Sequence, residues 1–158
     1  QHMVDDVMTD CLLLVQHLLN KTQIKVERDS KSVNPVLINR TEFQQVLINL
    51  IVNAIHSMED GGTLTLKNCD KFHDEKNGVL IEITDTGKGM APDVLKRAFD
   101  PFFTTKQSEG TGLGLSISQT LISRMGGEIK VESKVGRGTT FSIWLPAIVE
   151  EEPLSIIS

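Results

Sequence analysis

Long hydrophobic runs are missing from this sequence of 158 residues, and even its longer apolar stretches, such as Leu12–Val15 and Val46–Ile48, contain only a few residues. Neither stretch approaches the roughly 20 apolar residues that span a bilayer. The N-terminal residues also lack the pattern of a secretory signal peptide. We therefore expect a cytoplasmic chain that makes no membrane contact itself, whether or not a longer parent protein is anchored in a membrane.

Cysteine and excess positive charge are also scarce. The only two cysteines, Cys11 and Cys69, lie far apart, which excludes a disulfide framework or a zinc knuckle and favours reduced thiols. Lysine and arginine total 16 against 21 aspartates and glutamates, a net charge of -5, which argues against a nucleic-acid surface. The length and the 39% hydrophobic content predict one globular domain over residues 4–148, followed by a loose acidic tail over 149–158.

Hydrophobic periodicity predicts interleaved helices and strands. Apolar residues at three-and-four spacing, Leu14 and Ile117 among them, predict helices over 4–19, 41–58 with Thr41 as cap, a short one from Pro92, and 113–125. Alternation predicts strands over 24–28, 36–38, 63–67, 79–84, 128–133 and 139–145. Residues 70–78 are expected to form a solvated loop, and 100–112 a long irregular lid. The order is typical of a two-layer α/β sandwich with a mixed, mainly antiparallel sheet and about three helices on one face.

Two asparagines interrupt the most apolar helix. Asn49 and Asn53 lie four residues apart, so their amides share one helix face with Gln45 and His56. They could simply hydrogen-bond to neighbouring backbone or face water. Alternatively, an amide oxygen is a suitable hard ligand for a magnesium ion that also bonds to the phosphates of a nucleotide.

Strand parity places Asp85 on an apolar face. It shares the side of Val79, Ile81 and Ile83 at the end of the predicted strand. The carboxylate could cap its own Asp-x-Gly turn, or it could accept a hydrogen bond from the exocyclic amine of adenine. In the second case Gly87 and Gly89 would let a flat base approach the backbone, and Thr139 would add a hydroxyl from the last strand.

Glycines at alternate positions precede a predicted helix at Gly110-Thr111-Gly112-Leu113-Gly114. They are compatible with a flexible hinge, but also with backbone N–H groups that converge on a di- or triphosphate at a helix N-terminus. Lys106, which follows Thr105 in the preceding loop, could reach a terminal phosphate. The phenylalanines of this loop are better explained as packing residues.

Taken in order, these four segments resemble the ATP-binding domain of sensor histidine kinases of the nitrogen-regulation type, the Bergerat fold shared with gyrase and certain chaperones. The resemblance covers nearly the whole chain. Residues 45–54 resemble the N box, 85–89 the G1 box, 99–106 the F box and 110–116 the G2 box. It implies that ATP and Mg²⁺ are the cofactors, that Asn53 holds the metal with help from Asn49, that Asp85 binds the adenine amine, and that Gly110–Gly114 closes over the phosphates.

The departures from the family pattern are also informative. His56 stands where many members carry a phosphate-binding lysine, and Asn49 replaces the glutamate that activates water in the hydrolytic relatives. Little intrinsic ATP hydrolysis is therefore expected, and the γ-phosphate remains available for transfer. Of the histidines His2, His17, His56 and His73, only His73 superficially fits the phosphate-accepting motif, because Asp74 follows it, but it is expected in a polar loop without a helical pattern.

The resemblance therefore implies a catalytic fragment without its acceptor, which cannot autophosphorylate alone. Its expected partners are the dimerisation and histidine-phosphotransfer hairpin of a parent kinase and the receiver domain of a response regulator, and the fragment itself is expected to be monomeric. A serine-kinase regulator of the anti-sigma type remains the alternative. A gyrase-like clamp is disfavoured because the glutamate base is missing, and a non-binding scaffold is disfavoured because Asn53, Asp85 and the glycines are all present.

Overall fold

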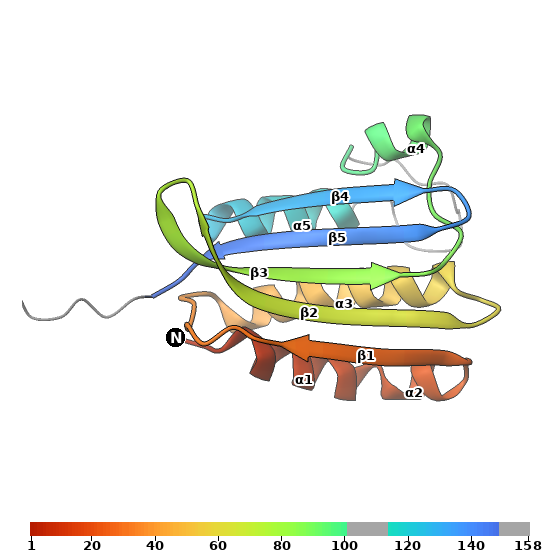
Figure 1. The fold of residues 1–158 in the computed structure, drawn as a ribbon, viewed down its shortest axis with the longest axis horizontal. Coiled ribbons are helices and arrows are strands. Elements are labelled where there is room, and N and C mark those ends of the chain that lie inside the picture. The colour runs from red at the N-terminus through yellow and green to blue at the C-terminus, as the bar shows by residue number, and fades with distance from the viewer. Residues whose placement is uncertain (101–113, 149–158) are drawn as a thin grey trace, which may run out of the picture.

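The computed structural model describes residues 1–100 and 114–148. Their order along the chain interleaves helices and strands as expected (Figure 1). The elements are α1 (Val4–Leu14), α2 (Gln16–Asn20), β1 (Ile24–Ser30), α3 (Arg40–Ser57), β2 (Gly62–His73), β3 (Lys76–Asp85), α4 (Pro92–Lys96), α5 (Gly114–Arg124), β4 (Glu128–Lys134) and β5 (Gly138–Pro146).

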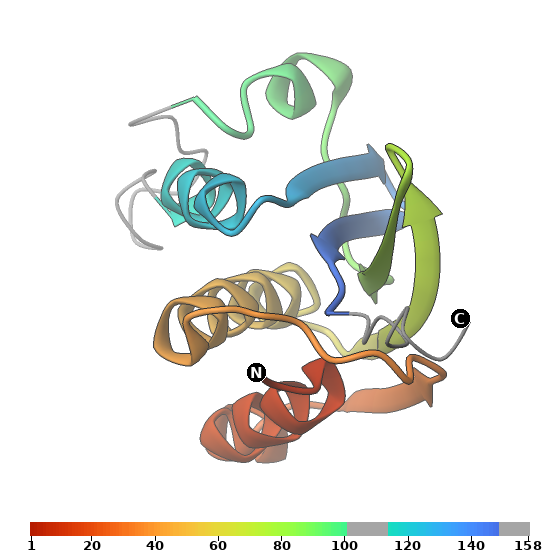
Figure 2. The same ribbon diagram turned by 90° about the vertical axis from the view of Figure 1, so that its left-hand side faces the viewer.

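The strands form one sheet in the order β1-β2-β3-β5-β4. The pair β1–β2 is parallel because α3 crosses over between the two strands, and the other three pairs are antiparallel. Figure 2 shows α1, α3 and α5 side by side on one face of the sheet, with α4 beyond the edge strand β4. The predicted α/β sandwich with a mixed, mainly antiparallel sheet is confirmed.

The core lies between the helices α1, α3 and α5 and the sheet, and α3 contributes the most buried residues. The apolar residues that recur at three-and-four spacing along α3 and at its C-cap are all buried: Phe43, Val46, Leu47, Leu50, Ile51, Ala54 and Met58. The sheet contributes the predicted alternating faces of β3 and β5, which bury Val79, Ile81, Ile83, Phe141, Ile143 and Leu145. Burial of this apolar surface fixes the side of β3 from which Asp85 projects.

The N-terminal helix is shorter than predicted. The α-helix ends at Leu14, Val15 adopts φ -99° and ψ 7°, and a second segment, α2, begins at Gln16. As a result Leu14 is 53% exposed, so its predicted place in the buried stripe is wrong, whereas Leu19 is buried instead. The cap of α3 also differs: Asn39 accepts a hydrogen bond of 3.0 Å from the Glu42 N–H, so Asn39 and not Thr41 caps the helix.

The charged segment 70–78 is not a loop. Strands β2 and β3 continue through it and turn at Asp74 and Glu75, whose φ values of 51° and 62° are those of a two-residue type I′ hairpin turn. The predicted strand over 36–38 is wrong, because Val36 makes only isolated bridges to His2 and Ala147. Among residues 1–100 and 114–148, no helix is both long and apolar enough to cross a membrane.

Candidate functional site

Asp85 is a buried carboxylate at the end of β3, only 5% exposed. Its Oδ1 accepts hydrogen bonds from the backbone N–H of Gly87 at 2.9 Å and of Thr139 at 3.3 Å. Burial raises the pKa of Asp85, although these two N–H groups and the Ser57 hydroxyl act to lower it. The turn that the Asp-x-Gly sequence allows is therefore present, and the carboxylate also faces the layer between the sheet and α3.

The turn after Asp85 packs against the end of α3. The Ser57 carbonyl oxygen accepts a hydrogen bond of 3.2 Å from the Lys88 N–H. A Cβ on Gly87 would lie 2.1 Å from Ser57 Oγ, and one on Gly89, whose φ is +71°, would lie 2.0 Å from the Lys134 carbonyl oxygen. Both glycines are thus required by close backbone approach, which is the property that the sequence suggested for a base-binding turn.

Thr139 lies opposite Asp85 on β5, as the strand register requires. Its hydroxyl, however, pairs with Ser133 Oγ at 2.8 Å, and only its backbone N–H reaches Asp85. Ser133 Oγ also accepts a hydrogen bond of 2.7 Å from the Met90 N–H. Ser133 therefore ties the glycine turn to the β4–β5 hairpin, and the geometry gives Thr139 a main-chain role beside the carboxylate.

The asparagines of α3 face the start of α5. Asn49 is half-buried and donates a hydrogen bond of 3.4 Å from Nδ2 to Ser118 Oγ, whereas Asn53, one turn later, is exposed. A Cβ on Gly114 would lie 2.9 Å from Asn49 Oδ1. His56, near the C-terminal end of α3, is half-buried. The two predicted metal ligands and the first described residue of the glycine segment are thus brought to one side of α3.

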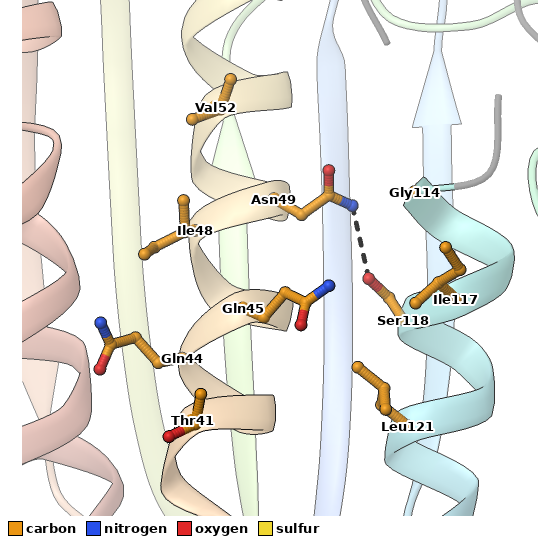
Figure 3. A pocket seen from close by; sticks show the side chains of 10 residues that line it. All are labelled: Thr41, Gln44, Gln45, Ile48, Asn49, Val52, Gly114, Ile117, Ser118 and Leu121. Carbon is orange, nitrogen blue, oxygen red and sulfur yellow. Dashed lines mark hydrogen bonds between the residues drawn. The ribbon is translucent and has the colours of Figure 1, made fainter. Parts of the chain in front are cut away.

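A groove of about 500 Å³ runs between α3 and α5 beside these residues (Figure 3). Figure 3 shows Asn49 and Ser118 pointing toward one another across it. Ile117, expected to point inward, instead lines the groove and is 41% exposed, because Ser118 takes the buried position on α5. The lining comprises Thr41, Gln44, Gln45, Ile48, Asn49, Val52, Gly114, Ile117, Ser118 and Leu121.

These contacts define a line along α3. Ser57 contacts the chain reversal that follows Asp85. Asn53 lies one helical turn before Ser57, and Asn49, which contacts Gly114, lies two helical turns before Ser57. At 1.5 Å per residue the distance from Ser57 to Asn49 is about 12 Å along the helix axis. The buried carboxylate of Asp85 therefore lies at one end of this line, and the amide oxygens of Asn53 and Asn49 follow. The N-terminus of α5, with its partial positive charge, lies at the other end.

Six of the predicted site residues lie outside the described part of the chain: Thr105, Lys106, Gly110, Thr111, Gly112 and Leu113. Sequence reasoning, in turn, missed Ser57, Ser118 and Ser133. Only Ser118 carried a usable signal, because Leu121, Ile122 and Met125 follow it at spacings of three, four and seven and place it on the inward stripe of α5.

The structure is thus a two-layer α/β sandwich with a buried aspartate at the end of a strand and a helix that carries two asparagines. Residues 38–148 match the family described as histidine kinase-, DNA gyrase B-, and HSP90-like ATPase. This match covers well over half of the chain, so the chain belongs to that family. The resemblance inferred from the four sequence boxes is confirmed at this level.

Curated relatives carry the names of sensor kinases. The chain is 40% identical to sensor kinase CckA of Brucella abortus over 93% of its own length and 17% of the relative's. It is 39% identical to sensor histidine kinase ZraS of Salmonella typhi over 94% of its length and 31% of the relative's. The chain therefore spans less than a third of the length of these relatives.

Solved structures agree with the fold. The catalytic domain of histidine kinase ThkA has a TM-score of 0.79 at 29% identity, with 91% of this chain and 92% of that domain covered. Full-length ShkA in complex with AMPPNP gives 0.79 at 27% identity over 96% of this chain and 32% of ShkA. ThkA in complex with the response regulator TrrA gives 0.75 at 26% identity, covering 92% and 40%. The architecture is that of a histidine kinase catalytic domain.

Proposed function

We propose that this chain binds ATP with Mg²⁺ and presents the γ-phosphate to a histidine on a separate helical hairpin of a sensor kinase. The buried Asp85 carboxylate is the observation that carries the proposal. It has two main-chain donors on Oδ1 and lies at the end of a strand beside a close-packed glycine turn. An acceptor in that position suits the exocyclic amine of adenine, with the carboxylate fixed in place before the base arrives.

The phosphates would lie along α3 toward α5. The N–H groups at the start of α5 and the glycines that precede it suit anionic oxygens. Asn53, exposed on the same side, and Asn49 offer amide oxygens of the kind that Mg²⁺ accepts together with water and phosphate. The donor set therefore fits the metal, which when bound would neutralise charge on the phosphate oxygens. The relative ShkA, solved with AMPPNP, supports nucleotide binding in this fold.

Transfer is favoured over hydrolysis by the residue at position 49. An asparagine amide cannot remove a proton from water, and Asn49 is engaged with Ser118 at 3.4 Å. The groove between α3 and α5 opens beside Asn49 and Gly114, which leaves room for an acceptor side chain to approach the phosphate end. The ThkA–TrrA complex supports a response regulator as the protein that takes the phosphoryl group next.

A phosphotransfer assay tests this function. The chain is mixed with labelled Mg-ATP and the acceptor hairpin of the parent kinase as a separate polypeptide. We expect acid-labile label on the hairpin, as phosphohistidine gives, none on the chain itself, and little free phosphate. Asp85→Asn should abolish transfer, whereas Asp29→Asn on the edge strand β1 serves as a matched control for loss of a carboxylate.

Three results would contradict the proposal. Acid-stable label on serine of a protein substrate would support the serine-kinase alternative. Rapid phosphate release without labelled hairpin would indicate a hydrolase. Unchanged transfer by Asp85→Asn would show that the adenine lies elsewhere.

A further inference from the structure

A second cluster of side chains of the types that bind metals lies far from Asp85 and the line of residues along α3. His73 and Asp74 occupy the tip of the β2–β3 hairpin, and Glu128 is the first residue of β4. The hairpin lies beside the start of β4 and the end of β5 in Figure 1, on the opposite side from the Asp85 end of β3. Lys76 and Asp85 are the first and last residues of the ten-residue strand β3, so the hairpin tip and the Asp85 site are about 30 Å apart.

The three ligand atoms already face one another. His73 Nε2 lies 3.2 Å from Glu128 Oε2 and 3.4 Å from Asp74 Oδ2, and all three atoms are within 4.8 Å of each other. Nitrogen and oxygen ligands at about 2.1 Å from a tetrahedral metal ion are roughly 3.4 Å apart. Charge-assisted hydrogen bonds are shorter, at about 2.7–2.9 Å. The two distances from the imidazole nitrogen therefore match edges of a metal coordination shell, and the two carboxylate oxygens lie within 4.8 Å of one another.

The imidazole nitrogen of His73 faces two carboxylates, and only its contact with Glu128 Oε2, at 3.2 Å, meets the criteria of a hydrogen bond. Nε2 of an imidazole carries at most one hydrogen, yet here it faces two carboxylate oxygens. One hydrogen shared between two oxygens forms only a weak, bifurcated hydrogen bond to each, whereas a cation placed between the three atoms would interact with all of them. The side chains of Asp74 and Glu128 are 71% and 44% exposed, so they have room to move toward an ion bound beside His73.

The imidazole is held in place by a rigid platform. Trp144 lies edge-on to His73, with ring centroids 5.1 Å apart and planes at 62°. Trp144 is only 7% exposed, donates a hydrogen bond of 2.9 Å from Nε1 to the Lys71 carbonyl oxygen, and covers Gly78 so closely that a Cβ there would lie 2.2 Å from the indole. A preorganised imidazole loses little freedom on binding.

We propose that His73, Asp74 and Glu128 bind a transition-metal dication of the Zn²⁺ class, with water completing the shell, and so tie the β2–β3 hairpin to β4. One imidazole and two carboxylates suit Zn²⁺, Co²⁺ or Ni²⁺, whereas Mg²⁺ and Ca²⁺ prefer oxygen ligands alone. The site is therefore distinct in chemistry from the Mg²⁺ expected with the nucleotide.

Trp144 provides a local readout, because it is the only tryptophan and the chain has no tyrosine. Co²⁺ is titrated into the whole chain without nucleotide, in millimolar Mg²⁺. A paramagnetic ion held beside His73 quenches the Trp144 emission. We expect saturable quenching with one equivalent bound and recovery on addition of Zn²⁺. The variants His73→Asn, Asp74→Asn and Glu128→Gln should each weaken binding by at least about tenfold.

Matched controls are His17→Asn in α2 and Glu132→Gln, which removes a carboxylate further along the same strand β4 as Glu128. Both should leave quenching unchanged, and melting by circular dichroism checks that every variant is folded. Absence of quenching at about 1 mM Co²⁺, corresponding to about 4 kcal/mol, would overturn the proposal. Equal quenching in the three ligand variants would also overturn it, because the metal would then lie elsewhere.

Discussion

Gly114, at the start of α5, lies directly against the amide of Asn49, so that a Cβ at position 114 would come within 2.9 Å of Asn49 Oδ1 and 3.0 Å of Nδ2. The same amide donates to the buried Ser118. Two helices that are distant in sequence therefore position one polar side chain at the end of the site where we propose that the phosphates bind.

Gly114→Ala is predicted to displace the Asn49 side chain. The amide is the end of a half-buried side chain that can move aside, and alanine favours a helix over glycine, so the free energy of unfolding should change little. The displaced amide should weaken the binding of Mg-nucleotide. Urea denaturation and calorimetric titration measure the two effects. Gln119→Ala, an exposed position on the same helix, is the control. Full nucleotide affinity in Gly114→Ala would show that the amide position does not matter.

Gly89 and Gly136 form a natural pair for testing the glycine turn. Their φ values are +71° and +80°, so alanine at either is strained by about 1–2 kcal/mol. A Cβ on Gly89, however, would lie 2.0 Å from the Lys134 carbonyl oxygen, whereas one on Gly136 meets nothing within 4 Å. Gly89→Ala should therefore lower the melting temperature more than Gly136→Ala. Equal losses would mean that backbone strain alone explains the glycine.

Asp85 is predicted to favour function at the expense of stability. Because burial raises its pKa, the native chain holds the proton to a higher pH than the unfolded chain does. Stability therefore falls as the pH rises from the ordinary carboxyl range through the raised pKa, and stays reduced above it. Asp85→Asn should melt at the same or a higher temperature at neutral pH and should lack this fall.

Melting curves between about pH 4 and pH 8 test this prediction around the ordinary carboxyl range. Asp29→Asn, which removes a more exposed carboxylate, controls for the change in net charge. Strong destabilisation by Asp85→Asn at neutral pH would show that the charged form is needed for folding.

The parts of the fold that could be predicted from sequence are those with a periodic apolar face. The buried arc of α3 and the alternation in β3 and β5 follow from burial on one side only, and they placed Asp85 on the inner face. The end of α1 before Val15 could not be predicted, because no glycine or proline lies there to indicate a break in the helix. The hairpin at Asp74 and Glu75 was missed because its strands are charged and exposed there and its turn has no glycine.

The parts of the fold and of the site that could not be predicted depend on contacts between segments that are distant in sequence. Val36 bridges both His2 and Ala147, which no local pattern reveals. In the site, the residue types at Asp85, Asn49 and Gly114 suggested their chemistry, but the pairing of Asn49 with Ser118 and of Thr139 with Ser133 depends on how α5 and β4 pack. The spacing of α5 allows Ser118 to face the core, but an apolar side chain is the usual choice for a buried position, so the sequence favours Ile117. In the structure Ser118 is buried and Ile117 is exposed.

Calorimetric titration of Mg-ADP and of a non-hydrolysable ATP analogue into the chain tests nucleotide binding most directly. Wild type should bind both. Asp85→Asn should bind neither, and Asn53→Ala should lose only the dependence on Mg²⁺, with Asp29→Asn and Asn20→Ala as controls. No binding at about 1 mM nucleotide, corresponding to about 4 kcal/mol, or unchanged binding by Asp85→Asn, would contradict the account.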